Sequence, residues 1–275
     1  MATRRSPRPA RVERPGLPIR FGYLGEVGGD DSAEAADATP RQLKTSELVA
    51  QRIVADIVED RLQVGDRLPA EAEMLQQYEV SRESLREGLR LLEVQGLVAI
   101  KRGPGGGPVV TSVDPRNLAR TSTLYYHLAG ATYNELFDAW QLFEPAVVRQ
   151  VTESVDRAEK KRALGPFLPE YDTERTRFMR RSTGFHEAIA NLGGNRVLSL
   201  MLRSLSHIVV EHIVRDLDPM AEQAEIIDDH AEIGRAMIDG RAQRAQKLMA
   251  EHIRHLVTFY REQFPDRMDD YVQWR

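Results

Sequence analysis

The sequence predicts a mainly α-helical protein in which a small winged helix-turn-helix domain precedes an all-helical bundle. Two short helical patterns flank a tight turn within residues 66–96, and a glycine-rich hairpin with basic residues follows them directly. After Pro115 the apolar residues recur with a helical period, and the alternating pattern of a strand is absent. The chain therefore divides into an extension over 1–40, a winged helix over 41–113 and a helical domain over 114–275.

The two helical patterns lie on either side of residues 79–81. Pro69 opens the first, because a first turn does not need the N–H that proline lacks, and Glu71 suits the positive end of a helix. Ser81 is the expected N-cap of the second helix, since its hydroxyl can accept a free backbone N–H. Gly96 is the expected stop. One stripe of the second helix should face a core, and it is formed by Leu85, Leu89 and Leu92.

A hairpin of two short strands, over residues 97–100 and 108–111, follows the second helix. Its tip carries Lys101, Arg102 and Gly103, followed by further glycines. A basic tip with little side-chain bulk can approach a nucleic-acid backbone or a minor groove without steric conflict. The tip is therefore a candidate wing.

The second helix also carries a stripe of arginines, at positions 82, 86 and 90. Arginine near the start of a recognition helix can bond guanine O6 and N7 bidentately or hold a phosphate, and serine hydroxyls suit phosphate oxygens. The alternative is a solvated helix face in which Glu83–Arg86 and Glu87–Arg90 form i,i+3 pairs. The order of helix, turn, helix and basic hairpin favours duplex DNA as the partner.

Residues 43–112 resemble the winged helix of GntR-type bacterial regulators. The matching segments are Gly65-Asp66-Arg67-Leu68-Pro69, Val80-Ser81-Arg82, Leu85-Arg86-Glu87, Leu91-Leu92-Glu93, Gly96-Leu97-Val98 and Arg102-Gly103. The resemblance implies DNA contacts from six residues: Ser81, Arg82, Ser84, Arg86, Arg102 and Gly103. The basic tip of the hairpin adds Lys101 as a seventh candidate. Ala72 stands where the family often has a basic residue, and Glu83 where a neutral one is common, so an operator sequence does not transfer.

Composition limits the remaining functions. The absence of cysteine excludes disulfides and thiolate zinc sites. The net charge is −4, and residues 41–114 carry more acids than bases, so DNA affinity must come from local placement of Arg and Lys. No apolar run approaches the length of a membrane span and the N-terminus lacks a signal core, so we expect a cytoplasmic protein with no membrane partner.

The extension over 1–40 has arginines among prolines and then a segment of acids among Gly and Ala. Little in it can form a core, so we expect disorder. Two interpretations stay open: a tolerated tail, or a basic arm that adds phosphate contacts.

The C-terminal part is expected to form a bundle of six or seven helices with antiparallel neighbours. Thr132-Tyr133-Asn134-Glu135 is a capping box at the start of one of them. The expected helices cover about 116–129, 132–152, 155–164, 170–191, 195–217, 219–238 and 241–264.

Three histidines of this bundle lie on apolar stripes that should point inward: His186, His230 and His252. Imidazoles converging from three helices would make a divalent metal site suited to Zn or Ni. The alternative is that each is a core histidine with an ordinary hydrogen-bond partner. The other four histidines, at 127, 207, 212 and 255, are expected to be surface or core residues.

The same region resembles the FCD effector domain of the FadR-like GntR subfamily, through Phe185-His186, Gly194-Asn195, the segment after His230, and His252. In metal-binding members an aspartate four residues before the first histidine completes the site, and Ser182 stands there. Trp140 stands where many members carry an arginine that holds a carboxylate effector. The effector pocket implied by the resemblance comprises Trp140, Ser182, His186, His230 and His252, and the tryptophan favours an apolar or fatty-acyl ligand.

These features predict a dimeric, ligand-responsive transcriptional repressor that binds a palindromic DNA operator, because two-fold protein symmetry is mirrored in DNA. Binding of a small-molecule effector would favour the arrangement that cannot bind DNA. One alternative is a metal-dependent enzyme that uses the three histidines, although no general-base carboxylate stands at a defined spacing. Another is an architectural DNA protein without a ligand. We expect a regulator and not an enzyme.

Overall fold

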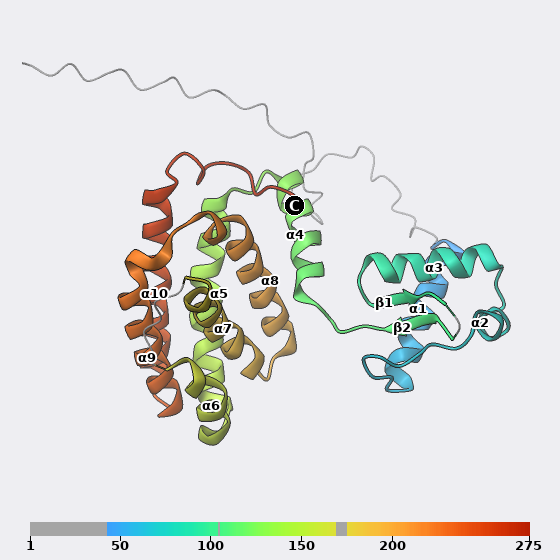
Figure 1. Ribbon diagram of the computed structural model, residues 1–275, viewed down its shortest axis with the longest axis horizontal. Coiled ribbons are helices and arrows are strands. Elements are labelled where there is room, and N and C mark those ends of the chain that lie inside the picture. The colour runs from blue at the N-terminus through green and yellow to red at the C-terminus, as the bar shows by residue number, and fades with distance from the viewer. Residues whose placement is uncertain (1–42, 104, 169–174) are drawn as a thin grey trace, which may run out of the picture.

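The computed structural model describes residues 43–275 except 104 and 169–174. The expected extension over 1–40, and residues 170–174 of an expected helix, lie outside the described residues. Figure 1 shows the winged helix on one side and the helical bundle on the other, with α4 (Pro115–Ala129) where the chain passes between them. The predicted fold class, a winged helix-turn-helix followed by an all-helical bundle, is confirmed.

Three helices and a two-stranded sheet make the winged helix. The helices are α1 (Thr45–Glu59), α2 (Glu71–Tyr78) and α3 (Arg82–Val94). Strands β1 (Val98–Lys101) and β2 (Gly107–Val110) are antiparallel, with Val98 opposite Val110 and Lys101 opposite Gly107. Helix α1 was not predicted separately, yet it supplies Val49 and Ile53 to the small core around Met74 and Leu85.

Gly88 sets the close packing of α1 on α3. A Cβ built on Gly88 would lie 2.9 Å from the backbone oxygen of Ser46 and 3.2 Å from a methyl of Val49. A glycine inside a helix lowers helix propensity by about 1 kcal/mol relative to alanine. Its presence here therefore has a packing reason, which is the approach of the two helices.

The bundle contains seven α-helices within the described residues, α4 and six more: α5 (Tyr133–Ser154), α6 (Arg157–Leu164), α7 (Arg175–Leu192), α8 (Arg196–His212), α9 (Gln223–Ile238) and α10 (Ala242–Gln263). Helix α5 lies at the centre and contacts α7, α8, α9 and α10. Its capping box is formed as predicted, with Thr132 accepting from the N–H of Glu135 and Glu135 accepting from the N–H of Thr132.

Two expected helices are shorter in the structure. Helix α8 ends at His212, because Ile213 leaves the helical region at φ −124° and ψ −60°, and a 3₁₀ turn covers Val214–Asp216. Residues Pro219–Glu222 form another 3₁₀ turn, in which Asp218 accepts from the N–H of Met220 at 3.2 Å, and α9 begins only afterwards. The segment Arg196–Asp216 is long and apolar enough to cross a membrane by length and composition. This finding differs from the expectation that no apolar run of the sequence approaches that length. Here it packs in the bundle against α4, α5 and α7.

Candidate functional site

The start of α3 is an exposed, capped helix N-terminus. The Ser81 hydroxyl accepts from the backbone N–H of Ser84 at 3.2 Å, as predicted for an N-cap. Leu85 and Leu89 on the opposite side of α3 are buried in the small core, which fixes the orientation of the helix. The remaining surface of α3 is therefore available to a partner.

The arginines of α3 all lie on this exposed surface. Arg86 lies 3.4 Å from Glu71 of α2, and Arg90 lies 2.6 Å from Glu93. The sequence had suggested Glu83 as the partner of Arg86 and Glu87 as the partner of Arg90. Both pairs are solvent-exposed, and such pairs contribute little to stability, so the guanidinium groups can exchange partners with a phosphate or a base edge.

The tip of the hairpin carries the other basic residues. Lys101, Arg102 and Gly103 are exposed. Gly103 has φ +95°, a left-handed conformation that favours glycine. At Gly106 a Cβ would lie 2.3 Å from the oxygen of Lys101, so the tight return of the chain requires glycine there as well.

The three inward histidines meet in the core of the bundle. Each offers a ring nitrogen that lies within 4.8 Å of those of the other two. Nε2 of His230 and Nε2 of His252 are 3.1 Å apart, and the rings of His186 and His252 are stacked with centroids 5.5 Å apart. His186, His230 and His252 come from α7, α9 and α10, so the convergence is a product of helix packing.

Two carboxylates orient two of these imidazoles. Nδ1 of His186 donates to Glu144 of α5, which is fully buried. Nδ1 of His252 donates to Asp229 at 2.9 Å. Because a carboxylate accepts, Nδ1 is the donor in both rings, and in the neutral form of each ring Nε2 carries the lone pair. This is the arrangement by which carboxylates hold metal-ligating histidines in proteins.

The electrostatics of the cluster also suit a cation. Burial lowers the pKa of His230 well below its usual range, and the neighbouring His252 and His186 lower it further. Burial lowers the pKa of His252 too, although the hydrogen bond with Asp229 opposes this effect. Both rings are neutral at pH 7, and the neutral imidazole is the form that binds a metal.

A pocket of about 140 Å³ adjoins the cluster between α5, α7, α8, α9 and α10. Trp140, Ser182 and His186, three of the five residues that the resemblance assigns to an effector pocket, line it. His230 and His252 are not among the residues that line it, although their rings contact the ring of His186. The Trp140 indole N–H donates to Glu144, so this side chain presents its apolar surface to the pocket.

Sequence reasoning missed several residues of this region. Glu144 stands four residues after Trp140 and therefore on the same helix face, a signal that was available in the sequence. Arg203, Ser206 and His207 of α8 also line the pocket, and their position depends on how α8 packs. Asp229 precedes His230 in the chain but contacts His252, a pairing that only the fold determines.

The remaining histidines have separate partners. His127 lies 3.1 Å from the oxygen of Val272, and the buried His212 lies 3.1 Å from the Tyr133 hydroxyl. His255 faces two acids, Glu222 at 3.1 Å through Nε2 and Glu225 at 3.4 Å through Nδ1. His255, Glu222 and Glu225 thus form a second polar cluster, which is less buried than the three inward histidines.

Each of the two domains matches a known protein family. The family descriptions that match are "Bacterial regulatory proteins, gntR family" over residues 45–106 and "FCD domain" over residues 135–255. The galactonate operon transcriptional repressor of Escherichia coli (strain K12) is 30% identical, covering 56% of this chain and 71% of its own length. The Glc operon transcriptional activator of the same strain is 25% identical, covering 76% of this chain and 85% of its own.

Among solved structures, Streptococcus agalactiae GntR has the same fold. Its TM-score is 0.60 at 20% identity, and the match covers 79% of this chain and 99% of that chain.

Proposed function

The chain belongs to the GntR family of bacterial regulatory proteins, and we propose that it is a dimeric transcriptional repressor that a small-molecule effector releases from a palindromic operator. Membership of this family implies that the protein controls transcription by binding DNA. The observation that carries the proposal is the surface of α3, where a capped N-terminus and exposed arginines stand opposite a buried apolar face. That surface fits the major groove.

Each basic element has a separate role in the proposed complex. Arg82 and Arg86 contact base edges or phosphates from α3, while Ser81 and Ser84 contact phosphates at its N-terminus. Lys101, Arg102 and Gly103 of the wing contact the adjacent backbone. The exposure of all these groups except the half-buried Ser84 supports the assignment.

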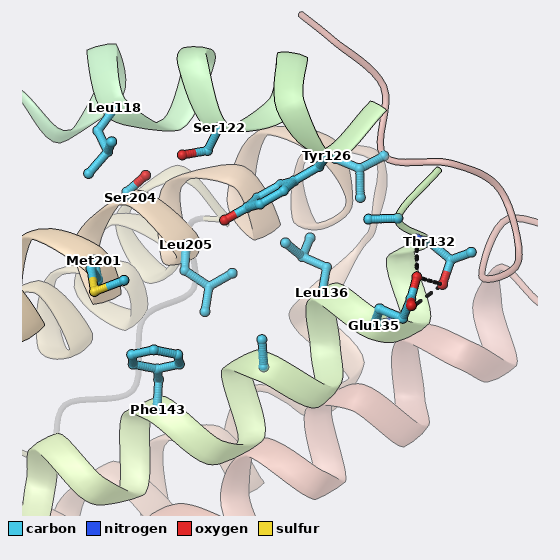
Figure 2. A pocket seen from close by; sticks show the side chains of 13 residues that line it. Leu118, Ser122, Tyr126, Thr132, Glu135, Leu136, Phe143, Met201, Ser204 and Leu205 are labelled. Atoms are coloured by element: carbon cyan, nitrogen blue, oxygen red, sulfur yellow. Dashed lines mark hydrogen bonds between the residues drawn. The ribbon is translucent and has the colours of Figure 1, made fainter. Parts of the chain in front are cut away.

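The dimer forms through the helical domain in this proposal. An apolar groove of about 230 Å³ lies between α4, α5 and α8, and Figure 2 shows Leu118, Phe143, Met201 and Leu205 around it. On the same helices, Leu142 of α5 and Val197 of α8 are 75% and 67% exposed. Exposed apolar surface of this kind is typical of protein interfaces. A second copy of the chain would cover them and set the spacing of the two winged helices.

The histidine cluster is proposed to hold Zn or Ni through His186, His230 and His252. The donor set fits, because the site is buried, the rings of His230 and His252 are neutral, and those of His186 and His252 are oriented by carboxylates. In the metal-free arrangement the Nε2 of His230 donates to His252, so metal binding requires its proton to move to Nδ1. A bound metal would supply a positive centre beside the pocket.

The effector acts through α8 in this scheme. Helix α8 lines the pocket and contacts α4. Arg120 of α4 donates to the backbone oxygen of Val94, at the end of α3, at 3.2 Å. A ligand that favours one position of α8 would therefore bias the position of the winged helix.

A metal-dependent enzyme is the alternative that the histidines raise. The candidate base in the cluster, Glu144, already accepts from Trp140 and His186. Both of its oxygens are engaged in orienting neighbours, so it is not free to take a proton from a substrate. We therefore propose a regulator without catalytic activity, located in the cytoplasm where its DNA lies.

DNA binding is tested on a duplex selected from a random pool by the purified protein. Arg82→Ala and Arg86→Ala should each weaken binding by about 1–3 kcal/mol if the arginine reads a base bidentately. Fluorescence anisotropy at fixed salt measures the affinity. Arg149→Ala, an exposed arginine of α5, is the matched control for charge. Wild-type affinity in the double variant would refute the assignment of α3.

Metal binding is tested on protein purified without a chelator or affinity tag and incubated with Zn or Ni. We expect one bound ion per chain in the wild type, its loss in His230→Ala, and tighter binding in Ser182→Asp. No bound metal in the wild type or in Ser182→Asp would refute the metal site and leave an organic pocket.

A further inference from the structure

A wide polar cavity lies where the winged helix meets the helical bundle. This junction cavity holds about 770 Å³ and is walled by the end of α3, the first half of α4 and the last turns of α8. It shares only His207 with the lining of the pocket beside the histidine cluster. Small-molecule sites occupy about 300–1,000 Å³, so the junction cavity is large enough for a ligand of its own.

Arginines dominate the lining of the junction cavity. They come from α3, α4, the 3₁₀ turn after α8 and the C-terminal segment, and they are Arg90, Arg116, Arg120, Arg215 and Arg275. Three acids line the cavity as well, and each already pairs with one of these arginines: Glu93 with Arg90 at 2.6 Å, Asp114 with Arg116 at 2.5 Å, and Glu211 with Arg215 at 2.8 Å. Two guanidinium groups therefore remain.

These two, Arg120 and Arg275, have no acidic partner in the part of the chain that the structure describes. Arg120 donates to the backbone oxygen of Val94 at 3.2 Å, and Arg275 donates to the side-chain oxygen of Gln273 at 3.2 Å. Both acceptors are neutral. A hydrogen bond from a guanidinium to an anion is roughly twice as strong as one between neutral groups, so an anion in the cavity can compete for both arginines.

The positive charge acts on two titratable groups of the same lining. Burial lowers the pKa of His212, and the charge of Arg275 lowers it further. The hydrogen bond from Arg116 lowers the pKa of Asp114, and His207 contributes in the same direction. Nearby cations disfavour an added proton for the same reason that they favour an added anion. The cavity therefore has the electrostatic character of an anion site.

We propose that the junction cavity binds a small oligophosphate anion, free or as part of a nucleotide, through Arg120 and Arg275. The apolar residues of the lining are Val94, Ala119 and Ile208, which offer little surface to the body of an organic acid. Binding must then come from charge, and an anion with several charges can engage both guanidinium groups. The planar fork of arginine matches the oxygens of a phosphate.

The bound anion would also act on the winged helix. The hydrogen bond from Arg120 to Val94 joins α4 to the end of α3, and an anion that takes Arg120 removes this link. A winged helix released from α4 has more freedom to lose when it binds DNA. The oligophosphate should therefore lower operator affinity from a site separate from the pocket beside the histidine cluster.

Isothermal titration calorimetry of the full, metal-free chain measures the binding, with pyrophosphate, ATP, AMP and citrate titrated separately at constant low ionic strength, where charge is least screened. We expect saturable binding of pyrophosphate and ATP at one site per chain, and weaker binding of AMP, which has one phosphate, and of citrate, which has none. Equal affinities for pyrophosphate and ATP assign recognition to the oligophosphate alone, and tighter binding of ATP assigns it to a nucleotide.

Arg120→Gln and Arg275→Gln should each weaken pyrophosphate binding by about 10- to 100-fold, the range of hydrogen bonds to a charged group. Arg120→Lys, which keeps the charge and loses the fork, should lie between wild type and Arg120→Gln. Arg149→Gln removes an exposed arginine of α5 outside the cavity and should bind as wild type.

Several results would overturn the inference. They are the absence of saturable binding of both pyrophosphate and ATP, citrate bound as tightly as pyrophosphate, or wild-type affinity in folded Arg120→Gln and Arg275→Gln proteins. Loss of pyrophosphate binding in Arg86→Gln, with no loss in Arg120→Gln, would place the anion on the exposed surface of α3 and also refute it.

Operator binding gives a second readout. Saturating pyrophosphate, at ionic strength held constant with NaCl, should lower the affinity of the wild type for its selected duplex. Arg275→Gln should bind the duplex as wild type without the anion and should need more pyrophosphate for the same response. Weaker duplex binding by Arg275→Gln in the absence of any anion would make this arginine a DNA contact and overturn the proposal.

Discussion

Glu144 should control both the stability of the helical domain and the form of His186 that faces a metal. Its two oxygens accept from the Trp140 indole N–H and from Nδ1 of His186, and its side chain is fully buried. Glu144→Gln keeps the shape but replaces one acceptor oxygen by an NH₂ donor. Because the indole N–H can only donate, the amide oxygen must stay with Trp140.

The amide NH₂ of Gln then faces His186. Nδ1 can pair with it only as an acceptor, so the His186 proton moves to Nε2, the nitrogen that should coordinate the metal. Loss of an orienting partner typically weakens metal binding by about 10- to 100-fold. Metal-free stability should fall by about 1–3 kcal/mol, because a hydrogen bond to a charged group is replaced by a neutral one.

Three measurements check this prediction. Competition with a chromophoric chelator gives the Zn affinity, urea unfolding of metal-free protein gives the stability, and ¹⁵N NMR of the imidazoles gives the tautomer. Glu153→Gln, an exposed glutamate of α5 paired with Arg149, is the matched control and should change stability by less than about 0.5 kcal/mol. An Nδ1–H tautomer and unchanged stability in Glu144→Gln would refute the reasoning even if no metal bound.

Three further perturbations follow from the structure. Burial, aided by Arg275 and Arg267, lowers the pKa of His212 to about 4. Since the unfolded chain takes up a proton below about pH 6.5 and the native state does not, the free energy of unfolding should fall by up to about 3 kcal/mol between pH 6.5 and 4. Urea titrations of His212→Gln should lack this pH-dependent component. Gly88→Ala should lower the melting temperature of the winged helix despite its better helix propensity, because the new Cβ would crowd the backbone of Ser46, and a rise would contradict the packing argument. Leu142→Glu combined with Met201→Glu should yield monomers in sedimentation velocity with normal helical content, whereas an intact dimer would show that the interface lies on another face.

Local rules determined much of the fold in advance. The Ser81 N-cap, the Thr132 capping box and the stop near Gly96 were readable because each depends on residues within one turn of the chain. The inward direction of His186, His230 and His252 was readable from helical periodicity for the same reason. The sequence did not indicate helix α1 separately, and it predicted that α8 continues to residue 217 although the helix ends at His212. Packing against neighbouring elements outweighs helix propensity in these two segments.

The chemistry of the pocket depended on contacts between distant segments. Glu144 and His186 are 42 residues apart, and Asp229 and His252 are 23 apart, so only the packing of α5, α7, α9 and α10 shows which carboxylate orients which ring. Trp140 favoured an apolar or fatty-acyl ligand in the sequence, whereas α8 adds the cationic Arg203 to the lining of the same pocket. A sequence records the period of each helix and not its rotation against its neighbours, and that rotation decides which polar side chains share a cavity.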